Sequence, residues 1–222
     1  MVSELKLAEM LCTRLCHDLT GPIGAVNNGA EFLEEEGFDM QHDAVDLILS
    51  SATEAVHRLQ FYRQAYGRVN DSGEASLSEK KQLVEDFFSS SKVKVDWPDN
   101  HADASGVSVS QKMARLILNA IIIVSGALLK GGTLSVRITS QDEQKDVVLR
   151  AVGDVVRLDE DVARILRGEA KLGTLTPKTA QLALVLKLLE ELDAHLTLVL
   201  DDGQCELHLV QKVVSDAVLS AV

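Results

Sequence analysis

The chain has 222 residues and a formal net charge of −12, with 46% of its residues apolar and only 4% aromatic. The length allows one large domain or two small ones, and the apolar content suffices for a packed core and is too high for a disordered chain. The acidic balance and the scarcity of aromatic side chains argue against nucleic acid and anionic membrane surfaces as main partners, because binding them needs basic or stacking groups.

The first part of the sequence predicts two helices joined by a short turn. Apolar residues recur every three or four positions over residues 3–36 and again over 39–68, and Gly37 separates the two runs. The apolar positions of the first run include Leu11, Leu15, Leu19, Ile23, Val26, Ala30 and Leu33. The short connection makes the helices antiparallel. Because two helices cannot enclose their apolar faces alone, we expect a homodimer in which two hairpins form a four-helix bundle.

The rest of the sequence predicts a second domain of the α+β class. Residues 71–78 are polar and small and indicate a linker between a helical domain, 1–70, and this domain, 79–222. We expect helices at 79–90, 109–129, 159–167 and 177–192, and strands at 92–97, 133–140, 146–152, 195–201 and 204–211. Asp202-Gly203, between the last two strands, is a strong hairpin signal. This order predicts a mostly antiparallel sheet covered by helices on one face, an α/β sandwich.

Neither the beginning of the chain nor its apolar segments indicate export or membrane insertion. The opening residues, MVSELKLAEMLC, lack the regions of a signal peptide, and the longest apolar run, 116–129, is too short to span a membrane. The cysteines are Cys12, Cys16 and Cys205, an odd and sparse set that fits a reducing compartment. We therefore expect a cytoplasmic protein with no membrane partner.

The most informative segment is His17-Asp18-Leu19-Thr20-Gly21-Pro22-Ile23-Gly24, within the first helix. His17 lies two positions, about 200°, from Leu15, so its imidazole points away from the apolar face. The residues that share the face of His17 are Thr20, Gly21, Gly24 and Asn28. A glycine inside a helix costs about 1 kcal/mol relative to alanine, and Pro22 should bend the helix. This small, polar face suits a partner that brings a reactive group very close to His17.

The titratable side chains around this face indicate phosphoryl chemistry. An exposed imidazole is an available nucleophile for phosphoryl groups, and Asp18 would accept a proton from the ring or orient it. Arg14 lies three residues before His17, where it would meet a phosphoryl oxygen or an acidic partner surface, although a plain surface arginine fits equally well. The alternative is an ordinary surface histidine on a kinked helix.

A metal or haem site at the cysteines is a weaker interpretation. Cys12, Cys16 and His17 form C-x₃-C-H, with His57 as the nearest further ligand, whereas haem attachment needs C-x₂-C-H and an oxidising export route. Both thiols fit small apolar positions of a helix better.

The pattern His-Asp-x-x-x-Pro on a helical hairpin resembles the phosphoacceptor box of sensor histidine kinases, whose usual form is His-Glu-x-x-x-Pro. The fuller string CHDLTGPIGAVNNGAEFL is more similar to the ChpT-like histidine phosphotransferases of alphaproteobacteria. The resemblance covers most of the chain, because residues 79–222 resemble the kinase ATPase domain. Together with the helix geometry, it implies that His17 and Asp18 are catalytic. The residues expected to dock the partner are Arg14, Thr20, Gly21, Pro22, Gly24 and Asn28.

The second half departs from the kinase pattern where ATP would be bound. Aligned on Gly131-Gly132, the segment LILNAIIIVSGALLKGG puts Asn119 at the first Asn of the kinase box and Ile123 at the position of the Mg²⁺ ligand. The next box, Asp-x-Gly-x-Gly, reads GDVVR over 153–157, and the last glycine loop reads GTLTPKTAQL over 173–182. A site without a Mg²⁺ ligand and a glycine cradle cannot position a triphosphate, so we expect no ATP binding.

The resemblance implies a kinase-shaped dimer that relays phosphoryl groups between the receiver domains of a hybrid histidine kinase and of response regulators. In that scheme, His17 takes the group from an aspartyl phosphate and passes it to a second aspartate. Mg²⁺ would come with the receiver, so the chain is expected to hold no metal or other cofactor of its own. Two alternatives stay open: a divergent ATP-dependent sensor histidine kinase, and a non-catalytic dimeric adaptor that binds receiver domains.

Overall fold

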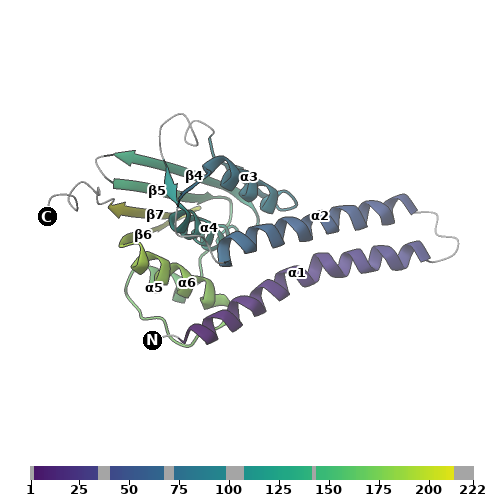
Figure 1. Cartoon of the computed structure of the whole chain (residues 1–222), viewed down its shortest axis with the longest axis horizontal. Helices are drawn as coiled ribbons and strands as arrows, with labels where there is room; N and C mark the ends of the chain where they lie inside the picture. Colours follow the sequence, from purple (N-terminus) through teal and green to yellow (C-terminus); the bar gives the residue numbers. More distant parts are fainter. Residues whose placement is uncertain (1–2, 35–40, 68–72, 99–107, 142–143, 213–222) are drawn as a thin grey trace.

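The computed structural model describes residues 3–34, 41–67, 73–98, 108–141 and 144–212, and it shows a helical hairpin that projects from an α/β body (Figure 1). The hairpin consists of α1 (Glu4–Glu34) and α2 (Gln41–Tyr66), as the apolar periodicity predicts. Gly37, the expected end of the first helix, lies outside the described residues. Among the residues that the structure describes, no helix is both long enough and apolar enough to cross a membrane. The predicted fold class is confirmed, and the dimer stays a prediction.

The body contains a five-stranded sheet with the strand order β2-β4-β5-β7-β6. Its strands are β2 (Val93–Asp96), β4 (Gly132–Gln141), β5 (Gln144–Val152), β6 (Ala194–Asp201) and β7 (Gln204–Lys212). β2 and β4 run parallel, and each other neighbouring pair is antiparallel, as predicted. Asp201 pairs with Gln204, so Asp202-Gly203 forms the predicted two-residue turn, and the φ of +77° at Gly203 favours glycine.

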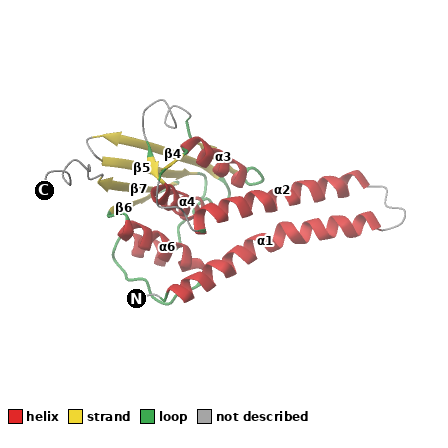
Figure 2. Cartoon of the chain, in the orientation of Figure 1, coloured by secondary structure: helices red, strands yellow, loops and turns green. Residues whose placement is uncertain are grey.

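One face of this sheet is buried against helices. The buried side chains alternate along the central strands, and they are Leu134, Val136, Ile138, Val147, Leu149, Ala151, Cys205, Leu207 and Leu209. Two helices, α4 (Gln111–Ser125) and α6 (Pro177–Glu191), lie between the strands and the hairpin (Figure 2). α4 is buried on nearly all sides because the sheet, α6 and α2 all pack against it. The flanks of the body are formed by α3 (Leu77–Phe88) and α5 (Glu160–Leu166).

The segment expected to be a linker contains secondary structure. β1 (Glu74–Ala75) pairs antiparallel with β3 (Val109–Ser110), and α3 begins at Leu77. The Gln111 side chain also donates a hydrogen bond to the carbonyl oxygen of Glu74 at 2.9 Å. These contacts attach residues 74–75 to the start of α4. Strands of two residues are too short to produce a recognisable sequence pattern, so the sequence did not reveal them.

The helix expected over 109–129 is shorter at both ends than predicted. It starts after Ser110, whose hydroxyl accepts a hydrogen bond from the Met113 amide at 3.1 Å, which is typical of an N-cap. It ends at Ser125, and Leu128 then forms an isolated bridge with Val156. The apolar run continues past Ser125 because Ala127 and Leu128 are buried in the core after the helix has ended.

Much of the apolar surface of the hairpin is uncovered within the chain. The two helices approach closely at Gly29, where a Cβ would lie 2.7 Å from Ile48 Cγ1. Away from this contact, apolar side chains of both helices are exposed, namely Ile23, Phe32, Leu33, Val45, Leu49, Val56 and Leu59. Leu49 is 60% exposed, which is unusual for a leucine in the middle of a long helix. The hairpin therefore has an apolar face that its own chain does not cover.

Candidate functional site

α1 carries His17 just past the part of the helix that packs on the body. Leu7, near the start of α1, shares an apolar cluster with Ala180 of α6, and Leu11 and Leu15 pack against the main core. His17 lies two residues further along, and its side chain is 86% exposed. The imidazole therefore projects into solvent, as its position on the helix predicts. The preceding part of the same helix is packed against the body.

Asp18 connects His17 to the second helix. Its Oδ1 atom lies 3.2 Å from His17 Nδ1, and its Oδ2 atom accepts a hydrogen bond from the Tyr62 hydroxyl at 2.5 Å. The Nε atom of Arg14 lies 3.8 Å from the same Oδ2. Because a carboxylate can only accept, the contact favours the tautomer with the proton on Nδ1. The lone pair of His17 is then on Nε2, which makes Nε2 the available nucleophile.

The face around His17 is open. Thr20, Gly21, Gly24 and Asn28 are exposed, and a Cβ added at either glycine would meet no packing neighbour within 4 Å. Packing within the chain therefore does not require glycine at these positions. The Thr20 hydroxyl donates to the Cys16 carbonyl at 2.7 Å, so this side chain lies back against the helix. We call His17, Thr20, Gly21, Gly24 and Asn28 the glycine strip.

Pro22, which is expected among the residues that dock the partner, does not lie on the glycine strip. It is buried within α1, so it is not placed to contact a partner. The physical reason is its position, five residues and about 140° around the helix from His17. The axis of α1 changes direction along its length, as expected for a helix with an internal proline (Figure 1). The contribution of Pro22 is to the shape of the helix.

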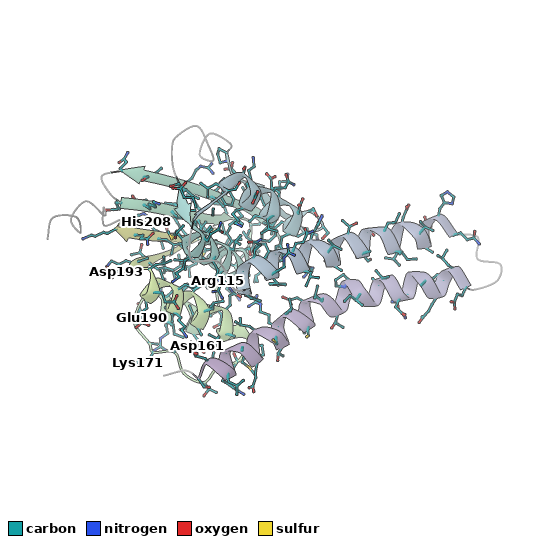
Figure 3. All side chains as sticks on the ribbon, in the orientation of Figure 1. Arg115, Asp161, Lys171, Glu190, Asp193 and His208 are labelled. Carbon is teal, nitrogen blue, oxygen red and sulfur yellow. The ribbon has the colours of Figure 1, made fainter. Side chains whose placement is uncertain are left out.

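A cleft of about 990 Å³ lies in the body next to α1. Arg14 lines its edge, and Ile122 and Ile123 of α4 form part of its wall. Charged residues at the other side include Asp161 and Lys171, which Figure 3 labels. Ile123 is the residue that the resemblance to kinases puts at the position of the Mg²⁺ ligand. Its side chain gives the cleft an apolar wall at this point.

The N-terminus of α6 borders the same cleft, and the amides of Thr176 and Thr179 there are engaged within the chain. The amide of Thr179 donates to the Thr176 hydroxyl at 3.2 Å, and the amide of Thr176 donates to the Thr179 hydroxyl at 2.9 Å. Pro177, at the first turn, has no N–H group. A phosphate cradle needs free amides at such a helix terminus. The capping box engages the amides of Thr176 and Thr179, so these two amides are not free for a phosphate.

Among the described residues, Cys12, Cys16 and His57 are not grouped as a metal site requires. Cys12 and Cys16 are exposed free thiols, and His57 Nδ1 lies 3.3 Å from the Ser89 hydroxyl. Within the described ranges of the chain, no three His, Cys, Asp or Glu side chains are grouped so that they could hold a metal ion.

Tyr62 also belongs to this site, although the apolar periodicity over 39–68 predicts it only as one apolar position of the second helix. Its partner Asp18 is 44 residues away, and no local motif connects the two. The antiparallel arrangement of the two helices was the available signal, and it does not by itself specify the register. It brings the last turns of α2 next to the middle of α1, where a tyrosine is able to reach a carboxylate.

An exposed histidine next to a carboxylate, on a helical hairpin joined to an α/β body, fits the class of histidine phosphotransferases. The model of the family described as histidine phosphotransferase C-terminal domain matches residues 77–204. The chain belongs to this family and is a phosphoryl transferase.

Two phosphotransferases agree with this assignment. The chain is 34% identical over 170 residues to the protein phosphotransferase ChpT of Brucella abortus (strain 2308), covering 76% of this chain and 78% of that protein. The solved structure of a bacterial phosphotransferase matches with a TM-score of 0.80 and 30% identity, covering 94% of this chain and 98% of that chain. The catalytic domain of the histidine kinase ThkA matches with a TM-score of 0.46 and 11% identity, covering 63% of this chain and 94% of that chain. The predicted resemblance to ChpT-like phosphotransferases is confirmed.

Proposed function

We propose that this chain relays a phosphoryl group between aspartates of receiver domains, with His17 as the transient carrier. The observation that supports this most directly is the exposed imidazole, whose Nδ1 faces Asp18 and whose Nε2 is open to a partner. Nε2 attacks the phosphorus of an aspartyl phosphate, and the N–P bond forms as the P–O bond breaks. The electron pair leaves with the aspartate carboxylate. Transfer to a second receiver reverses these steps.

The test is transfer from a receiver domain that carries radiolabelled phosphate, with Mg²⁺ present. The chain is expected to acquire an acid-labile, base-stable label and to lose it when a second, unlabelled receiver is added. A chain that binds the labelled receiver but takes no label would contradict the proposal and support the adaptor.

The partners of this relay are the receiver domains of a hybrid histidine kinase and of response regulators, and we place it in the cytoplasm. The cysteines of the chain, which are Cys12, Cys16 and Cys205, are free thiols, and free thiols fit a reducing compartment.

We also propose that the relay uses no ATP and that Mg²⁺ comes with the receiver. The apolar side chain of Ile123 and the capping box of Thr176 and Thr179 support this. The amide of Arg157 donates to the Ala127 carbonyl at 2.9 Å, so another amide beside the cleft is engaged. Calorimetry with millimolar ATP and Mg²⁺ is expected to give no binding heat. Binding heat together with labelling of the chain by ATP would instead support the divergent kinase.

We propose that the exposed apolar face of the hairpin is covered by a second copy of this chain, which completes a four-helix bundle. Sedimentation is expected to give a mass twice 24.1 kDa. A charge in this face, Leu49→Glu, should produce monomers, whereas Val199→Glu, on an exposed apolar residue of β6, should not. A monomeric wild-type chain would contradict the dimer.

A larger side chain in the glycine strip should slow phosphoryl transfer without lowering the stability of the fold. In Gly24→Leu, the new Cβ atom meets no packing neighbour within 4 Å, and the helix gains up to about 1 kcal/mol. The side chain occupies space through which a receiver must approach Nε2. A misplacement of about 1 Å can cost about 100-fold in rate, so we expect a loss of that order in the transfer assay. Urea denaturation should show undiminished stability.

The matched variant Gly24→Ala adds a single methyl group and should lose much less activity. Wild-type transfer rates in Gly24→Leu would show that the receiver does not approach along this strip.

A further inference from the structure

We propose that Tyr62 is a positioning residue for phosphoryl transfer, which holds the Asp18 carboxylate so that it keeps His17 in the reactive tautomer. This inference rests on the proposed role of His17. It begins with the hydrogen bond that crosses the hairpin, in which the Tyr62 hydroxyl donates to Asp18 Oδ2 at 2.5 Å. A partner on the same helix would move with Asp18, whereas Tyr62 belongs to the other helix.

Packing against neighbouring rings holds the Tyr62 ring in place, and this fixes the direction of its hydroxyl. The residue is 3% exposed. Its ring stacks on that of Tyr66, with centroids 5.1 Å apart and an interplanar angle of 22°, and meets the ring of Phe87 edge-on at 5.8 Å. Burial and the hydrogen bond to Asp18 raise the pKa of Tyr62 well above its ordinary range. The hydroxyl therefore stays protonated at physiological pH and remains a donor.

Tyr62 and His17 occupy different oxygens of the same carboxylate. Tyr62 binds Oδ2, near which the Arg14 Nε atom also lies, and Oδ1 lies 3.2 Å from His17 Nδ1. Fixing Oδ2 prevents rotation of the carboxylate and leaves Oδ1 directed at the imidazole. Asp18 is only 22% exposed, so water competes weakly for it, whereas the His17 ring is surrounded by solvent. The buried Tyr62 side chain thus fixes, through Asp18, the orientation of the exposed His17 ring.

As a consequence for the reaction, the Nε2 atom of His17 is held ready to act as the nucleophile. With the proton held on Nδ1, the lone pair on Nε2 is available to attack the phosphorus as the aspartyl P–O bond breaks. The ring becomes positively charged when the N–P bond forms, and Asp18 Oδ1 stabilises the Nδ1–H group or takes its proton. In the reverse step, the same proton stays at or returns to Nδ1. Preorganised orientation of this kind lowers the barrier without adding contacts to the receiver.

The test compares Tyr62→Phe with the matched variant Tyr66→Phe. Both keep the ring and remove one hydrogen-bonded hydroxyl, but the Tyr66 hydroxyl donates to Gln181 and not to Asp18. We expect Tyr62→Phe to transfer phosphoryl about tenfold more slowly at saturating receiver, the lower end of what loss of a histidine-orienting partner costs elsewhere. The receiver concentration for half-maximal rate should not change, because Tyr62 is buried. Tyr66→Phe should stay within about twofold of wild type.

A double-mutant cycle with Asp18→Ala distinguishes positioning from a general effect on the fold. If Tyr62 acts through Asp18, Tyr62→Phe will cause no further loss once Asp18 is alanine. Equal losses in both backgrounds, or a wild-type rate in Tyr62→Phe, would overturn the proposal. His17→Gln is measured alongside. Label on that variant would overturn the proposed role of His17, whereas an unlabelled His17→Gln with a fully active Tyr62→Phe would overturn the role of Tyr62 alone.

Discussion

His17→Gln is expected to abolish phosphoryl acceptance and leave the fold unchanged. Glutamine keeps the polarity and approximate size of the side chain but has no imidazole nitrogen to form the N–P bond. Because the His17 side chain is 86% exposed, its replacement should change the free energy of unfolding by no more than about 0.5 kcal/mol. The measurement is acid-labile label on the chain after incubation with a phosphorylated receiver, together with urea denaturation of the same variant.

His57→Gln provides the matched control, since His57 lies on the other helix of the hairpin, with Nδ1 3.3 Å from the Ser89 hydroxyl. This variant should accept label at the wild-type rate. Label on His17→Gln, or loss of label in His57→Gln alone, would contradict the assignment of the phosphoacceptor.

Asn119→Ala is expected to have the largest effect on stability, about 3 kcal/mol. Asn119 is fully buried, and its amide donates to the carbonyl oxygens of Ala65 at 2.8 Å and Arg115 at 2.7 Å. Its Oδ1 accepts a hydrogen bond from Gln181 Nε2 at 2.5 Å, and Gln181 in turn accepts one from the Tyr66 hydroxyl. Truncation removes all three of these side-chain hydrogen bonds from the buried core, and each contributes about 0.5–1.5 kcal/mol.

The location of this network explains why the effect should extend beyond one helix. Asn119 is on α4 and Gln181 is on α6, and Ala65 and Tyr66 are the final two residues of α2. Arg115, labelled in Figure 3, adds hydrogen bonds to the carbonyl oxygens of both α2 residues. The network thus attaches the hairpin to the body. Its loss should loosen the junction as well as the core.

Urea denaturation followed by circular dichroism measures this loss. Asn27→Ala is the control, because Asn27 is exposed and its amide donates to Glu31 within the same helix. It should change the free energy of unfolding by less than about 0.5 kcal/mol. A loss below about 1 kcal/mol in Asn119→Ala would show that the network contributes little to holding the three helices together.

The helices and strands were largely predictable, because local patterns carry them. Periods of three to four residues revealed α1 and α2, and the Asp202-Gly203 signal revealed the turn between β6 and β7. The errors occurred where a local pattern was too short or misleading. Strands β1 and β3 have two residues each, and Pro22 shares a motif with His17 although it faces another side of the helix.

Asn119 also shows that a local motif does not reveal the tertiary contacts of a side chain. Alignment on Gly131-Gly132 put this residue at a position of the kinase nucleotide box. The structure uses its side chain to connect α4 with α2 and α6. A motif position identifies the place in the fold, but the partners that meet there determine what the side chain does.

The sequence by itself determined that His17 is exposed, that Asp18 adjoins it, and that the surrounding face is small, because helical spacing fixes which side chains share a face. Only the tertiary structure decided what holds Asp18 in place. The Tyr62 hydroxyl reaches that carboxylate across 44 residues of sequence, which requires the two helices to pack in one particular register. Packing of side chains between the helices sets that register, and the spacing along either helix does not specify it.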